Sequence, residues 1–270
     1  MIKTPIQFYK MHGLGNDFVV INTIHQPIDI SSLPIQQIAH RQLGIGFDQL
    51  LLIEASHRAD FFCRIFNSDG SEATQCGNGL RCIARLVHEQ GLHTSSALTV
   101  ETHSGIFNIT ILDYQHIQIT MGIPQLQQNS WNIPLKNHPP LVATVLNLGN
   151  PHAIIRVPAL ATTPTHLLGK EISTHALFPQ GINVGFMEII QPNHIRLCTF
   201  ERGAGETYAC GSNASAAVAA GIINRWLENK VTVEYPYGTL EVEWPGGTHP
   251  MVMQGPAEYS FSGIFPHHPH

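Results

Sequence analysis

Apolar and polar positions follow the same order twice along the chain. In each half, short alternating or continuous apolar runs predict strands, and a stretch rich in Ala, Leu and Ile predicts a helix. The predicted strands comprise residues 18–24, 60–66 and 98–112 in the first half and residues 152–157, 195–200 and 231–244 in the second. The predicted helices comprise residues 79–91 and 214–226. This pattern indicates an α/β (α+β) protein with a mostly antiparallel sheet around one central helix in each half.

The two halves also match residue by residue. Cys210 follows Cys76 by 134 residues, and the same shift places Asn16 on Asn150 and Gln49 on Asn183. A period of this length is the size of a domain and is too long for a solenoid repeat. The sequence therefore predicts two pseudo-symmetric domains from an internal duplication, with an active site in the cleft between them where both cysteines converge.

A segment rich in Pro, Asn and Gln at residues 124–140 marks the predicted domain boundary. We assign residues 1–128 to an N-terminal repeat and residues 129–270 to a C-terminal repeat. The last strands of the second half could also cross back to complete the first domain, and the sequence leaves this alternative open.

Composition narrows the classes of function. The 270 residues carry a formal net charge of −5 and are 43% hydrophobic, as in an ordinary globular protein. This balance argues against nucleic acid and anionic membranes as partners, and no run approaches the roughly 20 apolar residues of a membrane span. The first residues contain no apolar signal segment, so we expect a cytoplasmic protein whose five cysteines are thiols rather than disulfides.

Each matched cysteine lies just before a predicted helix. The unpaired amides and the positive dipole end of a helix start favour a thiolate, so we expect a lowered pKa for Cys76 and Cys210. The same amides form an anion site suited to a substrate carboxylate. Two thiols on opposite sides of one carbon could remove a proton from one face and return a proton to the other.

Cysteines in this position can also have purely structural roles. A lone Cys-Gly before a helix is usually a small buried hydrophobic residue, although the repeated context favours chemistry. A Cys76–Cys210 disulfide is expected only in an oxidised, inactive form, and a zinc site is disfavoured because no CxxC or HxxxH pair accompanies these residues. The other three cysteines, Cys63, Cys82 and Cys198, are predicted to be core residues.

Polar residues near the cysteines supply candidate ligand groups. Carboxamides can bind both ammonium and carboxylate groups. They recur in short loops at Asn16, Gln49, Asn67, Asn78, Asn150 and Asn183. Any single Asn here could simply form a turn, Glu201–Arg202 could be a surface ion pair, and His152 could be structural. The alternatives are binding of ammonium and carboxylate by Glu201 and Arg202 and modulation of a thiol by His152. No motif for PLP, nucleotide or metal occurs, so no cofactor is expected.

Seven motifs together resemble the diaminopimelate epimerase family over essentially the whole chain. They are KMHGLGNDFVVIN, RQLGIGFDQLLLIE, RIFNSDGSEATQCGNGLRC, LGNPHAII, GINVGFMEI, TFERGAGETYACGS and MQGPAEYSFSG. The resemblance implies a PLP-independent, cytoplasmic, homodimeric isomerase. Its implied reaction interconverts LL- and meso-2,6-diaminopimelate for lysine and peptidoglycan synthesis.

The resemblance also implies a role for each matching residue. Cys76 and Cys210 would be the catalytic pair, with His152 and Glu201 modulating the pKa of the thiols. The implied substrate-binding groups are the side chains of Asn16, Gln49, Asn67, Asn150, Asn183, Glu201 and Arg202 and the backbone amides of Gly77, Asn78, Gly211 and Ser212. Asn213 stands where the family usually has glycine, which we expect to affect geometry rather than chemistry.

Three rival functions share some of these features. A cofactor-independent proline or hydroxyproline racemase would share the two cysteine turns, but proline has no distal carboxylate for Arg202 to bind. An isomerase of the phenazine-biosynthesis type would lack the cysteine pair. An anion-binding protein would account for the helix starts but not for two matched thiols flanked by carboxamides.

Overall fold

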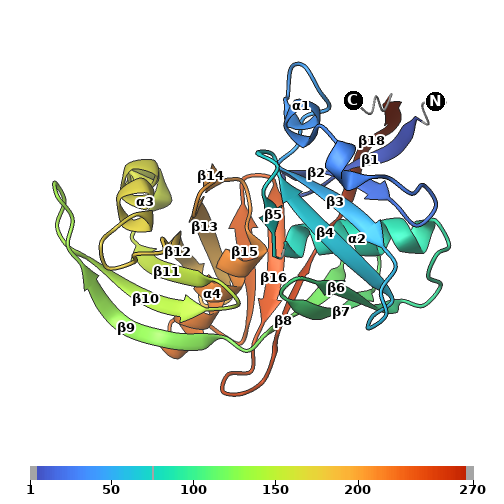
Figure 1. Ribbon diagram of the computed structural model, residues 1–270. Helices are drawn as coiled ribbons and strands as arrows, with labels where there is room; N and C mark the ends of the chain where they lie inside the picture. The colour runs from blue at the N-terminus through green and yellow to red at the C-terminus, as the bar shows by residue number, and fades with distance from the viewer. Residues whose placement is uncertain (1–4, 75, 266–270) are drawn as a thin grey trace. The chain divides into compact units, whose positions relative to one another are not determined.

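The computed structural model describes residues 5–74 and 76–265. The chain divides into two units, Met1–Ile119 with Pro256–His270 and Thr120–Gly255. The last strand, β18 (Glu258–Phe265), pairs antiparallel with the first, β1 (Ile6–Gly13), so the chain closes on itself in the first unit (Figure 1). None of the helices in the described ranges is long and apolar enough to cross a membrane.

The first unit is built on one twisted sheet. Its strands pair in the order β18–β1–β2–β3–β4–β6–β7–β8, with β5 added to β4. The pairs are antiparallel except β2–β3 and β4–β6. The remaining strands are β2 (Asn16–Asn22), β3 (Gln49–Glu54), β4 (Phe61–Asn67), β5 (Glu72–Ala73), β6 (Ala97–Thr102), β7 (Gly105–Ile111) and β8 (Ile117–Gly122). The helices are α1 (Ile35–Ala39) and α2 (Gly77–Glu89).

The second unit repeats this order. Its strands pair as β9–β10–β11–β12–β13–β15–β16–β17, with β14 added to β13, and only β11–β12 and β13–β15 are parallel. The strands are β9 (Gln125–Ile133), β10 (Leu141–Asn147), β11 (Pro151–Val157), β12 (Asn183–Gln191), β13 (His194–Glu201), β14 (Gly205–Thr207), β15 (Lys230–Tyr235), β16 (Gly238–Glu243) and β17 (Met251–Gly255). The helices are α3 (Thr165–Ser173) and α4 (Gly211–Ile223).

One buried helix occupies the centre of each unit. Helix α2 packs against β1, β2, β3 and β7, and α4 packs against β10 to β13, β16 and β17. Almost every residue of α4 is buried, because its Ala-rich sequence lets strands approach on all sides. The predicted mixed fold, a mostly antiparallel sheet around a central helix in each half, is confirmed.

The duplication is visible in the strand register. Phe18 lies opposite Gln49 in the parallel β2–β3 pair, and His152 lies opposite Asn183 in the parallel β11–β12 pair, 134 residues further along at both positions. The same shift relates two further strand contacts: Leu50–Phe66 matches Val184–Phe200, and Phe66–Glu72 matches Phe200–Glu206. It also relates the helix-starting hydrogen bonds, Leu80–Cys76 in the first unit and Ala214–Cys210 in the second. A register preserved to the residue indicates that both units descend from one backbone.

Candidate active site

Cys76 and Cys210 are the N-caps of α2 and α4. Both have extended backbone conformations, and their carbonyls accept the first helical bonds from Leu80 (3.0 Å) and Ala214 (2.9 Å). The helices begin at Gly77 and Gly211, two to three residues before the predicted starts, because the Gly-rich turns are themselves the first helical turn. Each thiol therefore lies beside the amides that a helix start leaves without an internal partner.

Strand ends gather the predicted carboxamides of the first unit at one edge of its sheet. Asn16 is the first residue of β2, Gln49 is the first residue of β3, and Asn67 is the last residue of β4. Because β3 runs parallel to β2 and antiparallel to β4, these three ends meet. Asn16 Oδ1 accepts from Asn78 Nδ2 at 3.2 Å and lies 3.8 Å from Cys76 Sγ.

Gln49 and Asn67 form a cross-strand pair in this group. Gln49 Nε2 donates to Asn67 Oδ1 at 3.0 Å, while Gln49 Oε1 is buried and has no hydrogen-bond partner within the described ranges. Gly79 keeps the helix close to the sheet, since a Cβ there would lie 3.0 Å from Leu51 and 3.5 Å from Cys76 Sγ. A buried acceptor without a donor, near a cysteine helix start, is what a substrate ammonium group can satisfy.

The second unit gathers the equivalent groups at the equivalent edge. Asn150 directly precedes β11, Asn183 begins β12 and Glu201 ends β13. Asn183 Oδ1 accepts from the backbone amide of Arg202 at 2.8 Å. The Arg202 guanidinium is exposed and donates to the carbonyl of Gln180 at 3.0 Å, which leaves most of its donors facing solvent.

Cys210 is buried, and its surroundings disfavour a negative charge. Burial raises the pKa of the Cys210 thiol well above its usual range, and the Glu201 carboxylate adds to the rise. The Ser212 hydroxyl, 3.4 Å from Cys210 Sγ, and the backbone amide of Asn213 act in the opposite direction. A negative charge on Cys210 is therefore disfavoured in this structure, even though the residue caps a helix. The lowered pKa expected from the sequence is wrong for the resting Cys210 thiol, because desolvation outweighs the helix start here.

His152 acts on a carboxamide in this structure. Its Nε2 lies 2.8 Å from Asn150 Oδ1, and burial lowers the pKa of His152 to about 3. The ring is therefore neutral, and Nε2–H is the donor that orients Asn150. A neutral imidazole brings no positive charge to a thiolate.

Asn213 occupies space that glycine provides on the neighbouring strand. It is fully buried in the first turn of α4, and a Cβ on Gly185 would lie 2.3 Å from Asn213 Oδ1. Neither polar atom of the Asn213 side chain has a hydrogen-bond partner within the described ranges. The side chain thus points into the unit, and the backbone amide is the part that faces Cys210.

The other three cysteines have environments different from those of the helix-capping pair. Cys63 and Cys82 are buried, as predicted, and burial raises the pKa of Cys82 to about 12, whereas Cys198 is only partly buried. None of the five cysteines, all within the described ranges, is in a disulfide. Those ranges also contain no cluster of three or more His, Cys, Asp or Glu side chains able to hold a metal ion.

Two residues of this site were not predicted from the sequence. Asp48 binds the Asn16 carboxamide at 2.9 Å, and Arg81 binds the Asn78 carboxamide at 2.9 Å. No sequence signal marked Arg81, because it lies with Asn78 and Arg85 on the polar stripe of α2, where an exposed side chain is the ordinary expectation.

Solved structures share this fold at low sequence identity. A hydroxyproline epimerase from Agrobacterium vitis matches with a TM-score of 0.76 at 16% identity, covering 98% of this chain and 93% of that one. A phenazine biosynthesis protein of the PhzF family from Bacillus anthracis matches with a TM-score of 0.74 at 18% identity, covering 97% and 99%. At such identities the likeness concerns the fold alone.

Sequence comparison is more specific. Residues 8–127 and 144–260 match the family model described as diaminopimelate epimerase. Diaminopimelate epimerases from Thioalkalivibrio sulfidiphilus and from an Azoarcus species are each 44% identical to the chain, and each match covers 96% of this chain and 98% of the relative. With two cysteine-capped helices in repeated surroundings and matches of this extent, the chain belongs to the diaminopimelate epimerase family.

Proposed function

We propose that this enzyme interconverts LL- and meso-2,6-diaminopimelate by two-base proton transfer between Cys76 and Cys210. The observation that carries the proposal is the pair of cysteines at equivalent helix starts, each beside carboxamides at a sheet edge, in a chain of this family. The reaction would supply lysine and peptidoglycan synthesis. It requires no PLP, because paired bases and helix-start amides do the work that a cofactor would otherwise do.

The proposed step moves one proton off the α-carbon and one proton onto it. One cysteine, as thiolate, takes the α-proton, and the electron pair of the C–H bond stays on the substrate as an enolate-like anion. The amides of Gly77–Asn78 and Gly211–Ser212 stabilise the charge that develops on the carboxylate. The other cysteine, as thiol, then protonates the opposite face and becomes the thiolate. The mechanism requires the two thiols to approach that carbon from opposite sides.

The remaining side chains bind the ends of the substrate in this proposal. Gln49, Asn67, Asn150 and Asn183 offer acceptors and donors to ammonium and carboxylate groups. Glu201 would pair with an ammonium group, and Arg202, with its exposed guanidinium, would bind the distal carboxylate. His152 would act by holding Asn150, and Glu201 would also modulate the Cys210 thiol.

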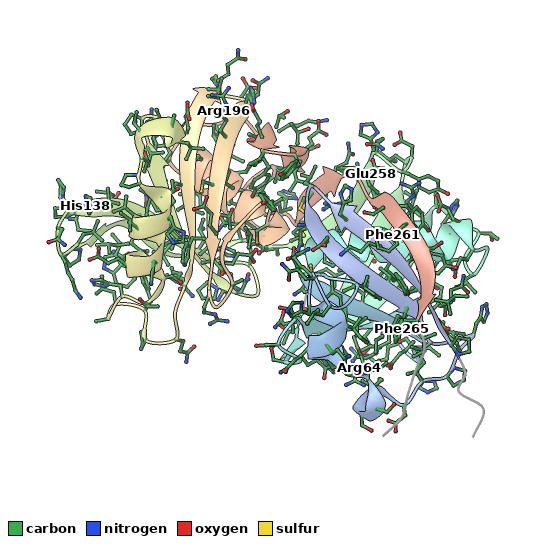
Figure 2. All side chains as sticks on the ribbon, turned by 90° about the horizontal axis from the view of Figure 1, so that it is seen from above. Arg64, His138, Arg196, Glu258, Phe261 and Phe265 are labelled. Atoms are coloured by element: carbon green, nitrogen blue, oxygen red, sulfur yellow. The ribbon has the colours of Figure 1, made fainter. Side chains whose placement is uncertain are left out.

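We further propose a cytoplasmic homodimer. Five cysteines without a disulfide, two of them needed as thiols, suit a reducing compartment. On β18 the side chains of Phe261 and Ile264 are 50% and 67% exposed, and Phe261 is labelled in Figure 2. Exposed apolar side chains on a sheet strand are typical of a surface that a second copy covers. Sedimentation of the wild-type protein and of Phe261→Lys tests this part.

Proton exchange in D2O tests the proposed reaction and its rival together. LL-diaminopimelate and L-proline are offered separately to purified enzyme without added PLP. Deuterium at the α-carbon of diaminopimelate together with the meso isomer, and none in proline, is the expected result. Exchange into proline alone would reassign the enzyme as a proline racemase, and no exchange into either would remove the catalytic role of the cysteines.

A further inference from the structure

Arg81 is a buried cation that has no carboxylate partner among the residues the structure describes. Its side chain is 0% exposed, Nε donates to the Pro256 carbonyl at 2.9 Å, and Nη2 donates to Asn78 Oδ1 at 2.9 Å. Nη1 has no hydrogen-bond partner within the described ranges. Burial lowers the pKa of Arg81 to about 10, and negative charge on Cys82 or Cys76 would oppose that shift. The guanidinium is cationic at neutral pH. Burying such a charge costs folding free energy, which points to a functional reason for keeping it.

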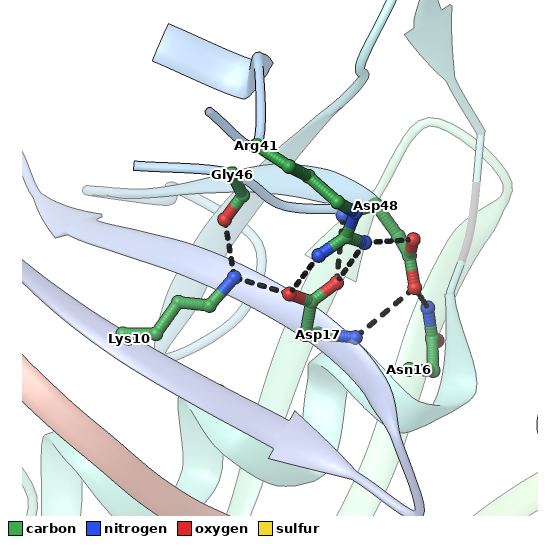
Figure 3. A network of polar contacts seen from close by, with 6 residues as sticks. All are labelled: Lys10, Asn16, Asp17, Arg41, Gly46 and Asp48. Atoms are coloured by element: carbon green, nitrogen blue, oxygen red, sulfur yellow. Dashed lines mark hydrogen bonds and ion pairs between the residues drawn. The ribbon is translucent and has the colours of Figure 1, made fainter. Parts of the chain in front are cut away.

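A chain of hydrogen bonds leads from this cation to Cys76 and the two carboxamides beside it, Asn16 and Asn78. We call these three residues the Cys76 half-site. Asn78 Nδ2 donates to Asn16 Oδ1 at 3.2 Å. Asn16 Nδ2 in turn donates to Asp48 Oδ2 at 2.9 Å, as Figure 3 shows. The relay therefore runs Arg81–Asn78–Asn16–Asp48. Cys76 Sγ lies 3.8 Å from the central acceptor, Asn16 Oδ1.

The two ends of the relay determine the orientation of both carboxamides. A guanidinium only donates, so Asn78 must turn its oxygen to Arg81 and its NH2 to Asn16. A carboxylate only accepts, so Asn16 must turn its NH2 to Asp48. The Asn16 oxygen is then directed to Cys76 and Asn78, and a flip of either amide would place two donors or two acceptors face to face.

The Asp48 end is anchored by further charges (Figure 3). Asp48 Oδ1 accepts from Arg41 Nη2 at 2.8 Å, and Arg41 also binds Asp17 with two hydrogen bonds of 2.9 Å. Lys10 binds Asp17 and the carbonyl of Gly46. Burial raises the pKa of Asp48, but the donors on Asn16 and Arg41 favour its carboxylate. Asp48 is therefore held by several charged neighbours besides Asn16.

The relay is absent from the duplicated half. Ser212, Ser215 and Ile182 stand at the repeat positions of Asn78, Arg81 and Asp48. The Ser215 hydroxyl is buried and has no hydrogen-bond partner within the described ranges. A relay present in one copy of a duplicated backbone is not needed to form that backbone. This points to a role in the chemistry of one cysteine.

We propose that Arg81 is a positioning residue for the Cys76 half-site, which acts through Asn78 to hold the Asn16 carboxamide in one orientation against the anchor Asp48. The part of this inference that concerns turnover rests on the proposed function. The part that concerns Cys76 itself does not, because thiol reactivity is measured without substrate.

The test compares three variants of the full-length enzyme. Arg81→Met should lower kcat about tenfold or more with a smaller change in KM, because misorientation of the Asn16 carboxamide slows the catalysed step. It should also raise the pH at which iodoacetamide alkylates Cys76 at half its maximal rate, read by mass spectrometry with Cys210 as internal reference. Arg81→Lys keeps a cationic donor and should recover most of both effects.

Arg85→Met is the matched control. Arg85 lies one turn further along α2 and also donates to the neighbouring backbone, at Ala257, but makes no bond to Asn78. It should leave kcat and the Cys76 alkylation profile unchanged. Equal effects from Arg85→Met and Arg81→Met, or a normal Cys76 profile in folded Arg81→Met, would overturn the proposal.

The route through Asn78 is tested by a double-mutant cycle. In an Asn78→Leu background, Arg81→Met should lower kcat little further, because the relay is already broken. Fully additive losses would show that Arg81 acts by another route. A wild-type enzyme with no exchange into diaminopimelate would refute the proposed function, while the alkylation profiles would still decide the role of Arg81.

Discussion

The Thr207 hydroxyl donates a 2.7 Å hydrogen bond to Glu201 Oε1, and it holds that carboxylate where its charge disfavours the Cys210 thiolate. Burial is the larger cause of the raised pKa of Cys210, and Glu201 is the next. The charge of one residue on β13 therefore helps to raise the pKa of the thiol at the start of α4.

Glu201→Gln should make Cys210 more acidic. Loss of the like charge should lower the pH of half-maximal Cys210 alkylation by roughly one unit, measured without substrate. Thr207→Val is the control, because it removes the donor but keeps the Glu201 charge, and it should not lower that pH. An unchanged profile in Glu201→Gln would show that the carboxylate does not control the thiol.

Gln49→Leu should impair binding more than folding. The buried Gln49 Oε1 has no donor within the described ranges, so an apolar side chain of similar size removes an unsatisfied group, which offsets the loss of the Gln49–Asn67 hydrogen bond. The urea midpoint should change little, while KM for diaminopimelate rises about tenfold through loss of a bond to the ligand. Gln26→Leu removes a partly exposed, hydrogen-bonded glutamine and should leave KM as it is. A stability loss without a change in KM would make Gln49 a structural residue.

His152 should make the protein less stable in acid. Its ordinary pKa of 6.5 falls to about 3 in the folded protein, so below pH 6.5 the unfolded chain binds a proton that the folded chain does not. The free energy of unfolding should then fall by about 1.4 kcal/mol per pH unit between these values. His152→Gln keeps a donor towards Asn150 without titrating. Subtracting its urea-unfolding curve from that of the wild type isolates the effect, and parallel pH profiles would contradict it.

Arg225→Gly should stabilise the protein. Arg225 has a φ of +60° directly after α4, while the equivalent residue after α2 is Gly91, with a φ of +68°. A side chain costs about 1 kcal/mol in this left-handed conformation, so glycine should raise the free energy of unfolding by up to that amount. Gly91→Arg should have the opposite effect. A lower urea midpoint for Arg225→Gly would mean that the exposed arginine makes a favourable contact.

The fold class and the family could be predicted because their signals in the sequence are local and repeated. Strand patterns, cysteines before helices and a constant shift between Cys76 and Cys210 need no knowledge of tertiary contacts, and the family and its epimerase activity are confirmed. The roles of individual residues remain predictions.

The relay was beyond the sequence because two of its three bonds join parts of the chain that are far apart in sequence. Asp48 meets Asn16 only because β2 and β3 pair in parallel, whereas Arg81 and Asn78, three residues apart on α2, are neighbours by helix geometry alone. Burial also decides protonation. His152 is neutral because it is fully enclosed, and no spacing of residues reveals that.

The preserved register and the unlike side chains of the two units suit the reaction proposed above. That reaction uses opposite faces of one carbon, and a backbone copied to the residue gives each unit the same thiol and the same helix-start amides. The other stereocentre keeps its configuration in this reaction, and its recognition requires groups that differ between the two copies. Asn67 in one copy and Glu201 in the other stand at the same repeat position but differ in charge, so the two copies are alike at the thiols and unlike beside them.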